Sequence, residues 1–202
     1  MKLPFMKDSP FKMPYTSPNI GSQLVKRIVS LLESVSSQRP IVIVCIGTDR
    51  STGDCLGPLI GTSLKKHRSP HFHVFGTLAE PVHAMNLDDT LQQINTKFDK
   101  PFLIGIDACL GQVASVGCIQ AGNGPVRPGA GVNKDLPPVG DIHITGIVNV
   151  GGFMEYFVLQ NTRLHLVMSM SDIISLSLFT AINNFHLSRT SRVETAASDF
   201  TS

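Results

Sequence analysis

Two aspartates each follow an apolar segment of the chain, a placement that suits acid–base chemistry. Asp54 lies in a polar loop after the run 41–46, and Asp107 ends the run 101–107. If these runs are parallel neighbours in a sheet, both carboxylates reach one crevice. Such a pair can hold a proton, activate water and protonate a leaving amine. In the plainer alternative, Asp54 caps the helix that begins near Leu56, and Asp107 only closes a strand.

Three further polar residues lie close to these segments. Asp49 belongs to the same loop as Asp54, and Glu80 and His83 follow a second strand pattern. All three are expected to bind substrate, although Asp49 also suits a turn and His83 also suits the surface. A divalent ion held by Asp49, Asp54, Asp107 and His83 is a further alternative, but no ligand spacing is diagnostic.

Cysteine chemistry is a weaker alternative. Cys55 lies near the N-terminus of a predicted helix, where a thiol pKa can fall, and Cys109 comes shortly after Asp107. No local signature supplies the histidine base that such a nucleophile needs. The four cysteines form no C-x-x-C pair, so neither a disulfide framework nor a zinc knuckle is predicted. The chain also lacks a G-x-S-x-G elbow, a P-loop and a G-x-G-x-x-G after the first strand, which argues against nucleotide hydrolysis and hydride transfer.

Strand and helix patterns alternate along the chain. This alternation predicts a three-layer αβα domain, an α/β fold with a mostly parallel central sheet. Strand patterns occupy 41–46, 71–76, 101–107, 116–120, 142–148 and 164–168, and helix patterns occupy 21–36, 56–66, 86–98 and 152–161. A last helix is predicted to begin at a Ser171-Asp172 cap. Glycine and proline are concentrated between residues 121 and 141, which is typical of a functional loop.

Composition limits the class of protein. The 202 residues are 42% hydrophobic and 16% charged, with a net charge of +2 and no basic stripe for nucleic acid. No apolar run is long enough to span a membrane, and the proline-interrupted N-terminus lacks the apolar core of a signal peptide, so a cytoplasmic protein is predicted. Residues 21–186 are expected to form one α/β domain, between an extended or disordered arm at 1–20 and a disordered tail at 187–202.

Several motifs together resemble the YyaC family of sporulation proteins from spore-forming Firmicutes. They are IGTDRSTGDCLGPLIG, GTLAEPVHAMNL, FLIGIDACLG, PVRPGAGVNKDLPPVGDIHITGIVN and VMSMSDIISLSLF. That family is similar to the germination protease of spores and, more distantly, to hydrogenase maturation proteases, which share a fold of the phosphorylase/hydrolase type. The resemblance implies that Asp54, in TGDCLGP, and Asp107, in IGIDA, are the two catalytic acids.

The same resemblance implies roles for two other regions. The stretch from Pro128 to Gly131, which includes Gly129, resembles a Pro-Gly-Ser-Gly loop of the germination protease, and these three residues are expected to bind substrate. In hydrogenase maturation proteases, two acids and a histidine contact a metal of the substrate enzyme. By motif order, Asn149 or a neighbour takes the place of that histidine here.

The function implied is an endopeptidase of sporulation or germination, located in the cytoplasm of the forespore or in the spore core. Its expected partner is a protein or peptide substrate such as a small acid-soluble spore protein, and neither nucleic acid nor a membrane is expected. The scheme requires no cofactor and no bound metal. Two alternatives stay open: a non-catalytic protein of the same fold that binds a spore protein, and a metal-dependent hydrolase of a small molecule.

Overall fold

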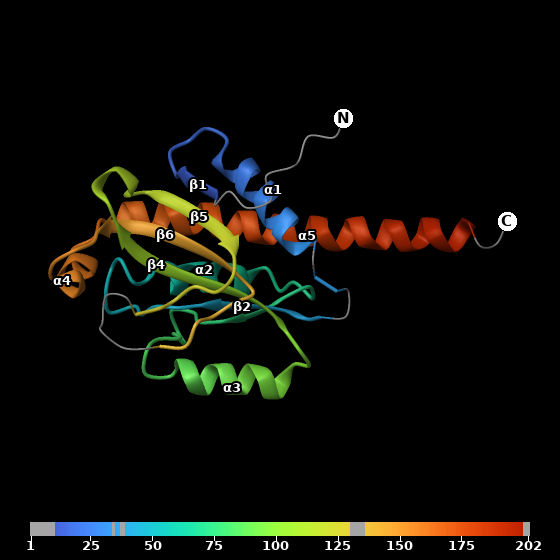
Figure 1. Ribbon diagram of the computed structural model, residues 1–202, viewed down its shortest axis with the longest axis horizontal. Helices are drawn as coiled ribbons and strands as arrows, with labels where there is room; N and C mark the ends of the chain where they lie inside the picture. Colours follow the sequence, from blue (N-terminus) through green and yellow to red (C-terminus); the bar gives the residue numbers. More distant parts are fainter. Residues whose placement is uncertain (1–10, 34, 37–38, 130–135, 200–202) are drawn as a thin grey trace.

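The computed structural model describes residues 11–33, 35–36, 39–129 and 136–199, and a six-stranded sheet forms its centre (Figure 1). The strands lie in the order β1-β5-β6-β4-β2-β3. They are β1 (Phe11–Pro14), β2 (Ile41–Cys45), β3 (His73–Phe75), β4 (Phe102–Gly111), β5 (Cys118–Asn123) and β6 (Ile142–Val150). The helices are α1 (Ile20–Leu32), α2 (Leu56–Lys66), α3 (Leu87–Lys97), α4 (Glu155–Gln160) and α5 (Leu164–Asp199), with a short 3-10 helix at Val113–Ser115.

The sheet is mostly parallel, as predicted. Strands β3, β2, β4 and β6 pair in parallel, whereas β5 pairs antiparallel with both β6 and β1. Every residue of β2 is buried, which explains its unbroken run of mainly β-branched residues. Because β2 and β4 are parallel neighbours, the loop after β2 and the end of β4 emerge at the same edge of the sheet. This is the arrangement that the two-aspartate hypothesis requires.

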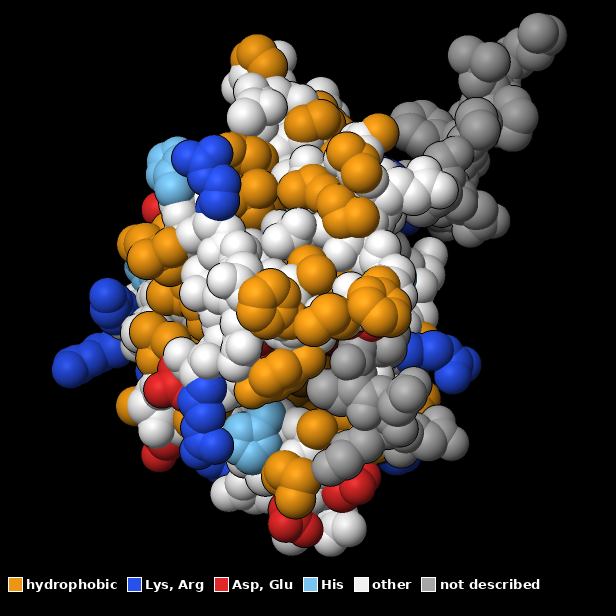
Figure 2. All heavy atoms as spheres, turned by 90° about the vertical axis from the view of Figure 1, so that its left-hand side faces the viewer, with side chains coloured by type: hydrophobic (Ala, Val, Ile, Leu, Met, Phe, Trp, Pro, Cys, Tyr) orange, Lys and Arg blue, Asp and Glu red, His pale blue; other side chains and the backbone are white. Residues whose placement is uncertain are grey.

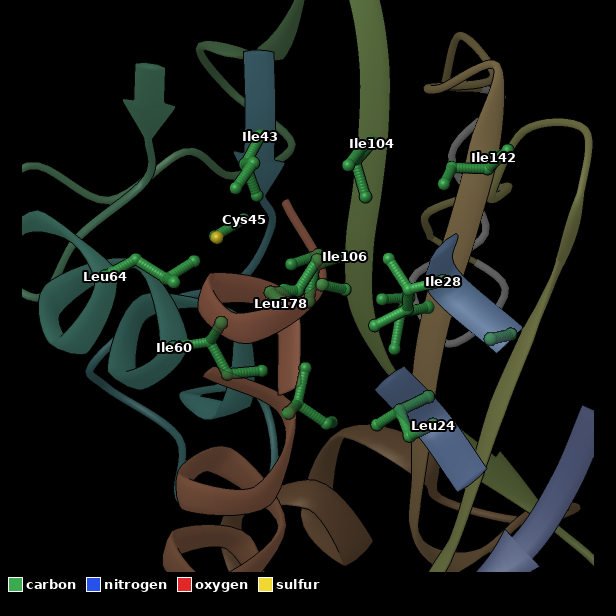
Figure 3. Close-up of a cluster of buried hydrophobic side chains, with 14 of the residues drawn as sticks. Leu24, Ile28, Ile43, Cys45, Ile60, Leu64, Ile104, Ile106, Ile142 and Leu178 are labelled. Carbon is green, nitrogen blue, oxygen red and sulfur yellow. The ribbon is translucent and has the colours of Figure 1, made fainter. Parts of the chain in front are cut away.

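Helices cover both faces of the sheet, so the three-layer prediction is confirmed. Helices α1, α2 and α5 pack on one face around the larger hydrophobic core, and α3 packs on the other. Figure 3 shows how sheet side chains meet those of three helices in the larger core: Ile43, Ile104 and Ile106 of the sheet, Ile60 and Leu64 of α2, Leu178 of α5, and Leu24 and Ile28 of α1. Each such buried aliphatic side chain stabilises the fold by roughly 1.5–3 kcal/mol.

The last helix begins earlier than predicted. Residues 164–168, predicted to be a strand, form the first turn of α5, and Ser171, predicted to precede the helix as its cap, is buried inside it. Its hydroxyl donates to the carbonyl of Met168, which satisfies the group within the helix. A short apolar run fits a strand or a helix equally well, and the helical spacing becomes clear only from the longer set of buried positions: Val167, Met170, Ile174, Leu178 and Ile182.

The same helix also ends later than predicted. It continues to Asp199, through residues expected to form a disordered tail. Residues 187–199 contain neither glycine nor proline, so nothing in the sequence stops the helix there. Among the described residues, the span Leu164–Arg189 is long and apolar enough to cross a membrane. By length and composition, this segment contradicts the expectation that no apolar run is long enough to span a membrane, although half of its most apolar window is buried within the protein.

A second difference concerns the predicted N-terminal arm. Residues 11–14 form β1, an edge strand that pairs with β5. Phe11 and Met13 pack against the larger core, while Lys12 and Pro14 alternate with them on the exposed side. Pro14 is tolerated because an edge strand leaves one row of backbone groups unpaired. The expectation for residues 1–10 lies outside the described residues.

Candidate active site

Asp107 lies in β4 just beyond the end of β2. Strand β2 stops at Cys45, whose partner is Ile106, but β4 continues to Gly111 alongside β6. The prediction that the strand ends at Asp107 is therefore wrong, because β6 provides partners for further residues. Asp107 is only 8% exposed, and one carboxylate oxygen accepts a hydrogen bond from the N–H of Ala108 at 2.9 Å. A buried carboxyl with one backbone donor stands at the edge where β2 has ended.

The side chain of Asp107 faces the side of the sheet on which α3 packs. Side chains alternate along a strand, so Asp107 lies on the same face as Gly105. Gly105 is covered by Val126 and Val139, which form an antiparallel bridge across the base of the glycine- and proline-rich segment. A Cβ on Gly105 would lie 2.4 Å from the carbonyl oxygen of Val139, so only glycine permits this approach. The base of the segment therefore lies over β4 one side-chain position away from Asp107.

Asp54 is held in its loop by contacts at both ends. The N–H of Thr48 donates to the carbonyl oxygen of Asp54 at 3.3 Å, which closes the loop after β2. The N–H of Gly53 donates to the carbonyl oxygen of Leu159 in α4 at 2.8 Å. A Cβ on Gly53 would lie 2.9 Å from a methyl carbon of Leu159 and from the hydroxyl of Thr162. The residue before Asp54 is thus packed tightly against the end of α4.

Burial raises the pKa of both aspartates. For Asp107, burial has the largest effect and the charge of Asp54 adds to it, so its pKa lies well above the usual range despite the bond from Ala108. For Asp54, burial raises the pKa, and a backbone hydrogen bond from Thr48 and the charge of His83 lower it in part. Asp54 is therefore the acid that ionises more readily, and Asp107 is the acid that retains a proton.

His83 reaches this edge of the sheet through a short parallel bridge. Val82 pairs with Ile46, directly after the end of β2, and its carbonyl oxygen accepts a hydrogen bond from Gly47 at 2.8 Å. The Nδ1 atom of His83 accepts the N–H of Met85 at 3.3 Å. Of the three additional polar residues predicted for the site, His83 is the one whose charge acts on Asp54.

Asp49 and Glu80 lie on the surface around the site. Asp49 is exposed, with the hydroxyl of Thr48 3.5 Å from its carboxylate. Glu80 forms an ion pair with Lys65 at 3.0 Å, in which both side chains are more than half exposed. Neither acid is among the charges that shift the pKa of Asp54 or Asp107. Their role in substrate binding stays a prediction.

Part of the glycine- and proline-rich segment is described. Pro128 is buried and Gly129 has a φ of 87°, a backbone conformation that favours glycine. Gly131 lies outside the described residues. The predicted contacts of Pro128, Gly129 and Gly131 with a substrate therefore stay a prediction, supported by the position of the segment's base over β4.

The two cysteines near the acids have the wrong electrostatics for a nucleophile. Burial and the charge of Asp54 raise the pKa of Cys55, and its Sγ donates to the carbonyl of Thr52 at 2.9 Å. Burial raises the pKa of Cys109 to about 11. The weaker cysteine alternative is therefore not supported, because burial and the neighbouring acid raise the pKa of Cys55 at this helix N-terminus. Both groups stay protonated thiols at neutral pH.

Sequence reasoning named Asn149, by motif order, but missed the contacts through which Asn149 and Thr162 support the Asp54 loop. Asn149, at the end of β6, donates through its side-chain amide to the carbonyl of Val158 at 3.3 Å and to the hydroxyl of Thr162 at 3.2 Å. Thr162 is buried, and its hydroxyl lies close to Gly53. Asn149 therefore anchors α4, which in turn contacts the loop. No local sequence motif predicts these contacts, because they join segments that are far apart in the chain.

The structure also bears on which side chains could bind a metal ion. Across the described ranges, no cluster of three or more histidine, cysteine, aspartate or glutamate side chains has the proximity needed to bind a metal ion. The alternative of a cation held by Asp49, Asp54, Asp107 and His83 thus receives no geometric support, and metal dependence stays a question for experiment.

Comparison with known proteins places these residues in a family. Residues 12–177 match the family model described as a protein of unknown function, DUF1256. The chain belongs to the DUF1256 family. It is also 59% identical over 153 residues to the uncharacterized protein YyaC of Bacillus subtilis (strain 168), which covers 74% of this chain and 75% of that protein. The YyaC resemblance predicted from the motifs is therefore confirmed, and the DUF1256 match includes both Asp54 and Asp107.

One solved structure completes the comparison. The NiFe hydrogenase maturation protease HycI from Thermococcus kodakarensis KOD1 aligns with 77% of the DUF1256 chain and 97% of its own length. The TM-score is 0.49 and the sequence identity is 17%.

Proposed function

We propose that this DUF1256 protein is a peptidase in which Asp54 and Asp107 form an acid–base pair. The observation that carries the proposal is the different environment of two neighbouring carboxyls. Burial raises the pKa of both, but the charge of Asp54 adds to the shift of Asp107, whereas Thr48 and His83 offset part of the shift of Asp54. Two acids whose pKa values are separated in this way suit the opposite tasks of base and acid.

In the proposed reaction, ionised Asp54 takes a proton from a water molecule as the water oxygen attacks the carbonyl carbon of the peptide bond. Protonated Asp107 gives its proton to the leaving nitrogen as the C–N bond breaks. The products are a carboxylic acid and an amine. Transfer of the proton that Asp54 took from water to Asp107 restores the starting state of both acids. Each positioned proton transfer of this kind contributes roughly 10²–10⁴-fold to the rate.

The proposed substrate is a protein or peptide of the spore, such as a small acid-soluble spore protein. Membership of the YyaC family supports this choice, because the motifs of that family resemble the germination protease. The glycine- and proline-rich segment beside Gly105 would frame the peptide, with Pro128 and Gly129 at its described end. The protein would act in the cytoplasm of the forespore or in the spore core, during sporulation or germination.

The decisive experiment measures cleavage of small acid-soluble spore proteins and of a spore-extract peptide pool, with and without a chelator. Wild type, Asp54→Asn and Asp107→Asn are compared, with Asp88→Asn as a control because Asp88 is exposed in the first turn of α3. The acid-pair proposal expects kcat to fall at least about 100-fold in the two site variants and to be unchanged in the control.

Other results would point elsewhere. Folded wild-type protein that binds these substrates without cleaving them would favour a non-catalytic binding protein. Activity that disappears with the chelator would favour a metal-dependent hydrolase. Full activity in either site variant would remove that aspartate from the mechanism.

A further inference from the structure

Helix α4 and the two residues before it expose large apolar side chains that the fold does not bury. Phe153 is 84% exposed, Met154 59%, Tyr156 62% and Phe157 56%, and no residue of α4 is buried. Figure 2 shows hydrophobic side chains gathered on the end of the molecule at which α4 lies in Figure 1. A helix of six residues is too short to be stable by itself, so its apolar residues would ordinarily be expected to anchor it. Here Leu159 packs against the larger core, whereas Tyr156 and Phe157 are exposed.

The anchoring of α4 depends on other groups. Leu159 accepts the N–H of Gly53, and Val158 accepts the amide of Asn149. These bonds fix α4 against the residue that precedes Asp54. The exposed apolar side chains therefore belong to α4 and to the two residues before it, and α4 contacts the residue that precedes Asp54.

We propose that Phe153, Met154, Tyr156 and Phe157 form a docking patch for an apolar segment of the protein substrate. The inference rests on the proposed peptidase function, and it specifies that the enzyme takes unfolded or extended polypeptides with an apolar segment near the cleaved bond. Aromatic and methionine side chains are well suited to this task, because they offer large contact areas to partners of varied shape.

The size of the docking patch distinguishes this occupant from a second copy of the chain. Side chains of this kind bury roughly 150–250 Å² each. At the observed exposures, the four together offer roughly 400–650 Å². A stable dimer needs about 800 Å² from each partner. The patch is sufficient to anchor a few residues of a polypeptide and too small to form a dimer interface.

Charge distinguishes the same occupant from a lipid surface. Residues 151–161 carry a single charged side chain, the acidic Glu155. Amphipathic elements that bind anionic membranes combine apolar residues with lysine and arginine, which are absent from this stretch. Ionised Asp54 adds negative charge next to Gly53, which contacts α4, and Arg163 is the first basic residue after this stretch. An apolar polypeptide segment is the partner that fits.

The test measures binding without turnover, so that it does not depend on the peptidase proposal. Fluorescein-labelled β-casein, a disordered and apolar-rich protein, is titrated with the full-length Asp107→Asn protein and followed by fluorescence anisotropy. The same background then receives Phe153→Ser/Phe157→Ser. A matched control receives Met168→Ser/Leu176→Ser, which alters exposed apolar residues of α5 away from α4.

Relative to the Asp107→Asn parent, the Kd for casein should rise at least tenfold in Phe153→Ser/Phe157→Ser, called the α4 variant. It should change less than twofold in Met168→Ser/Leu176→Ser, the α5 control. Equal affinity in both double variants, or no binding by the parent, would overturn the docking patch. A dimer in sedimentation velocity that the α4 variant loses, or binding to phosphatidylglycerol vesicles that it loses, would also overturn it in favour of those partners. If the α4 variant alone loses casein binding while wild type cleaves nothing, the docking patch stands and the peptidase proposal fails.

Discussion

The charge of Asp54 raises the pKa of Asp107, although the two residues belong to different segments of the chain. The pairing arises because β2 and β4 are parallel neighbours. Strand β2 ends at Cys45, opposite Ile106, so Asp107 lies just beyond the end of β2, where the loop that contains Asp54 begins. The consequence is a carboxyl that keeps its proton beside one that gives its proton up. Each of the following predictions depends on this relationship or on the contacts that maintain it.

Replacing Asp107 with asparagine is expected to stabilise the protein at neutral pH. A carboxyl whose folded pKa is raised holds a proton that the unfolded chain releases above about pH 4. The free energy of unfolding of wild type should therefore fall as the pH rises from about 4 through the folded pKa. Asparagine cannot ionise, so most of this pH-dependent decline should be absent in Asp107→Asn. At pH 8 its free energy of unfolding should exceed that of wild type by on the order of 1–3 kcal/mol.

Urea unfolding between pH 4 and pH 9 measures this difference. The control is Asp88→Asn, which changes an exposed aspartate and should keep the wild-type slope. Parallel pH profiles for wild type and Asp107→Asn would show that the Asp107 carboxyl is not protonated in the folded protein.

Substituting Gly53 with alanine is expected to lower kcat together with stability. The new Cβ would lie 2.9 Å from Leu159 and Thr162, so α4 or the Asp54 loop has to shift. A shift of this kind should cost about 1–3 kcal/mol of stability, as other small-to-large changes at packed positions do. Peptidase assays and thermal unfolding of the same samples measure both effects. Gly21→Ala is the control, since nothing lies within 4 Å of that position, and it should leave kcat unchanged.

Changing His83 to glutamine should move the acid limb of the pH–activity profile to higher pH. The charge of His83 lowers the pKa of Asp54, so its removal raises that pKa, and Asp54 becomes the active base only at a higher pH. Profiles of kcat/KM from pH 4 to pH 9 measure the shift. His73→Gln is the matched control, because His73, in β3, contacts the ring of Phe98 at the end of α3. A profile for His83→Gln that overlays that of wild type would remove His83 from the electrostatics of the site.

Thiol reagents are expected to leave the activity intact. The pKa of Cys109 is raised to about 11 and that of Cys55 is also raised, so neither residue supplies a thiolate at neutral pH. Iodoacetamide at pH 7.5 should label the folded protein slowly and the urea-unfolded protein rapidly, as read by mass spectrometry. Cys55→Ala should retain the wild-type kcat. Rapid inactivation that follows alkylation of Cys55 would support the alternative mechanism in which Cys55 is the nucleophile.

Local patterns in the sequence were sufficient for most elements of the fold, and they placed Asp54 after one strand pattern and Asp107 at the end of another. The run at 41–46 is apolar and β-branched because β2 is covered on both faces, and the polar loop after it begins where the strand loses its partners. The helix predicted at 56–66 has the observed bounds, with its basic residues in the last turn. Such features depend on neighbours within a few residues, which periodicity and turn chemistry report directly.

Tertiary structure alone decided the rest. Residues 164–168 became helical because α5 packs along α1 and α2 over many turns, which a five-residue run cannot indicate. Phe11 and Met13 became part of a strand because β5 offers its edge to them. The contact between Gly53 and α4, and the electrostatic coupling of Asp54 to Asp107, join groups that are distant in sequence. Distances and burial of this kind exist only once the chain has folded, and they determine which acid keeps its proton.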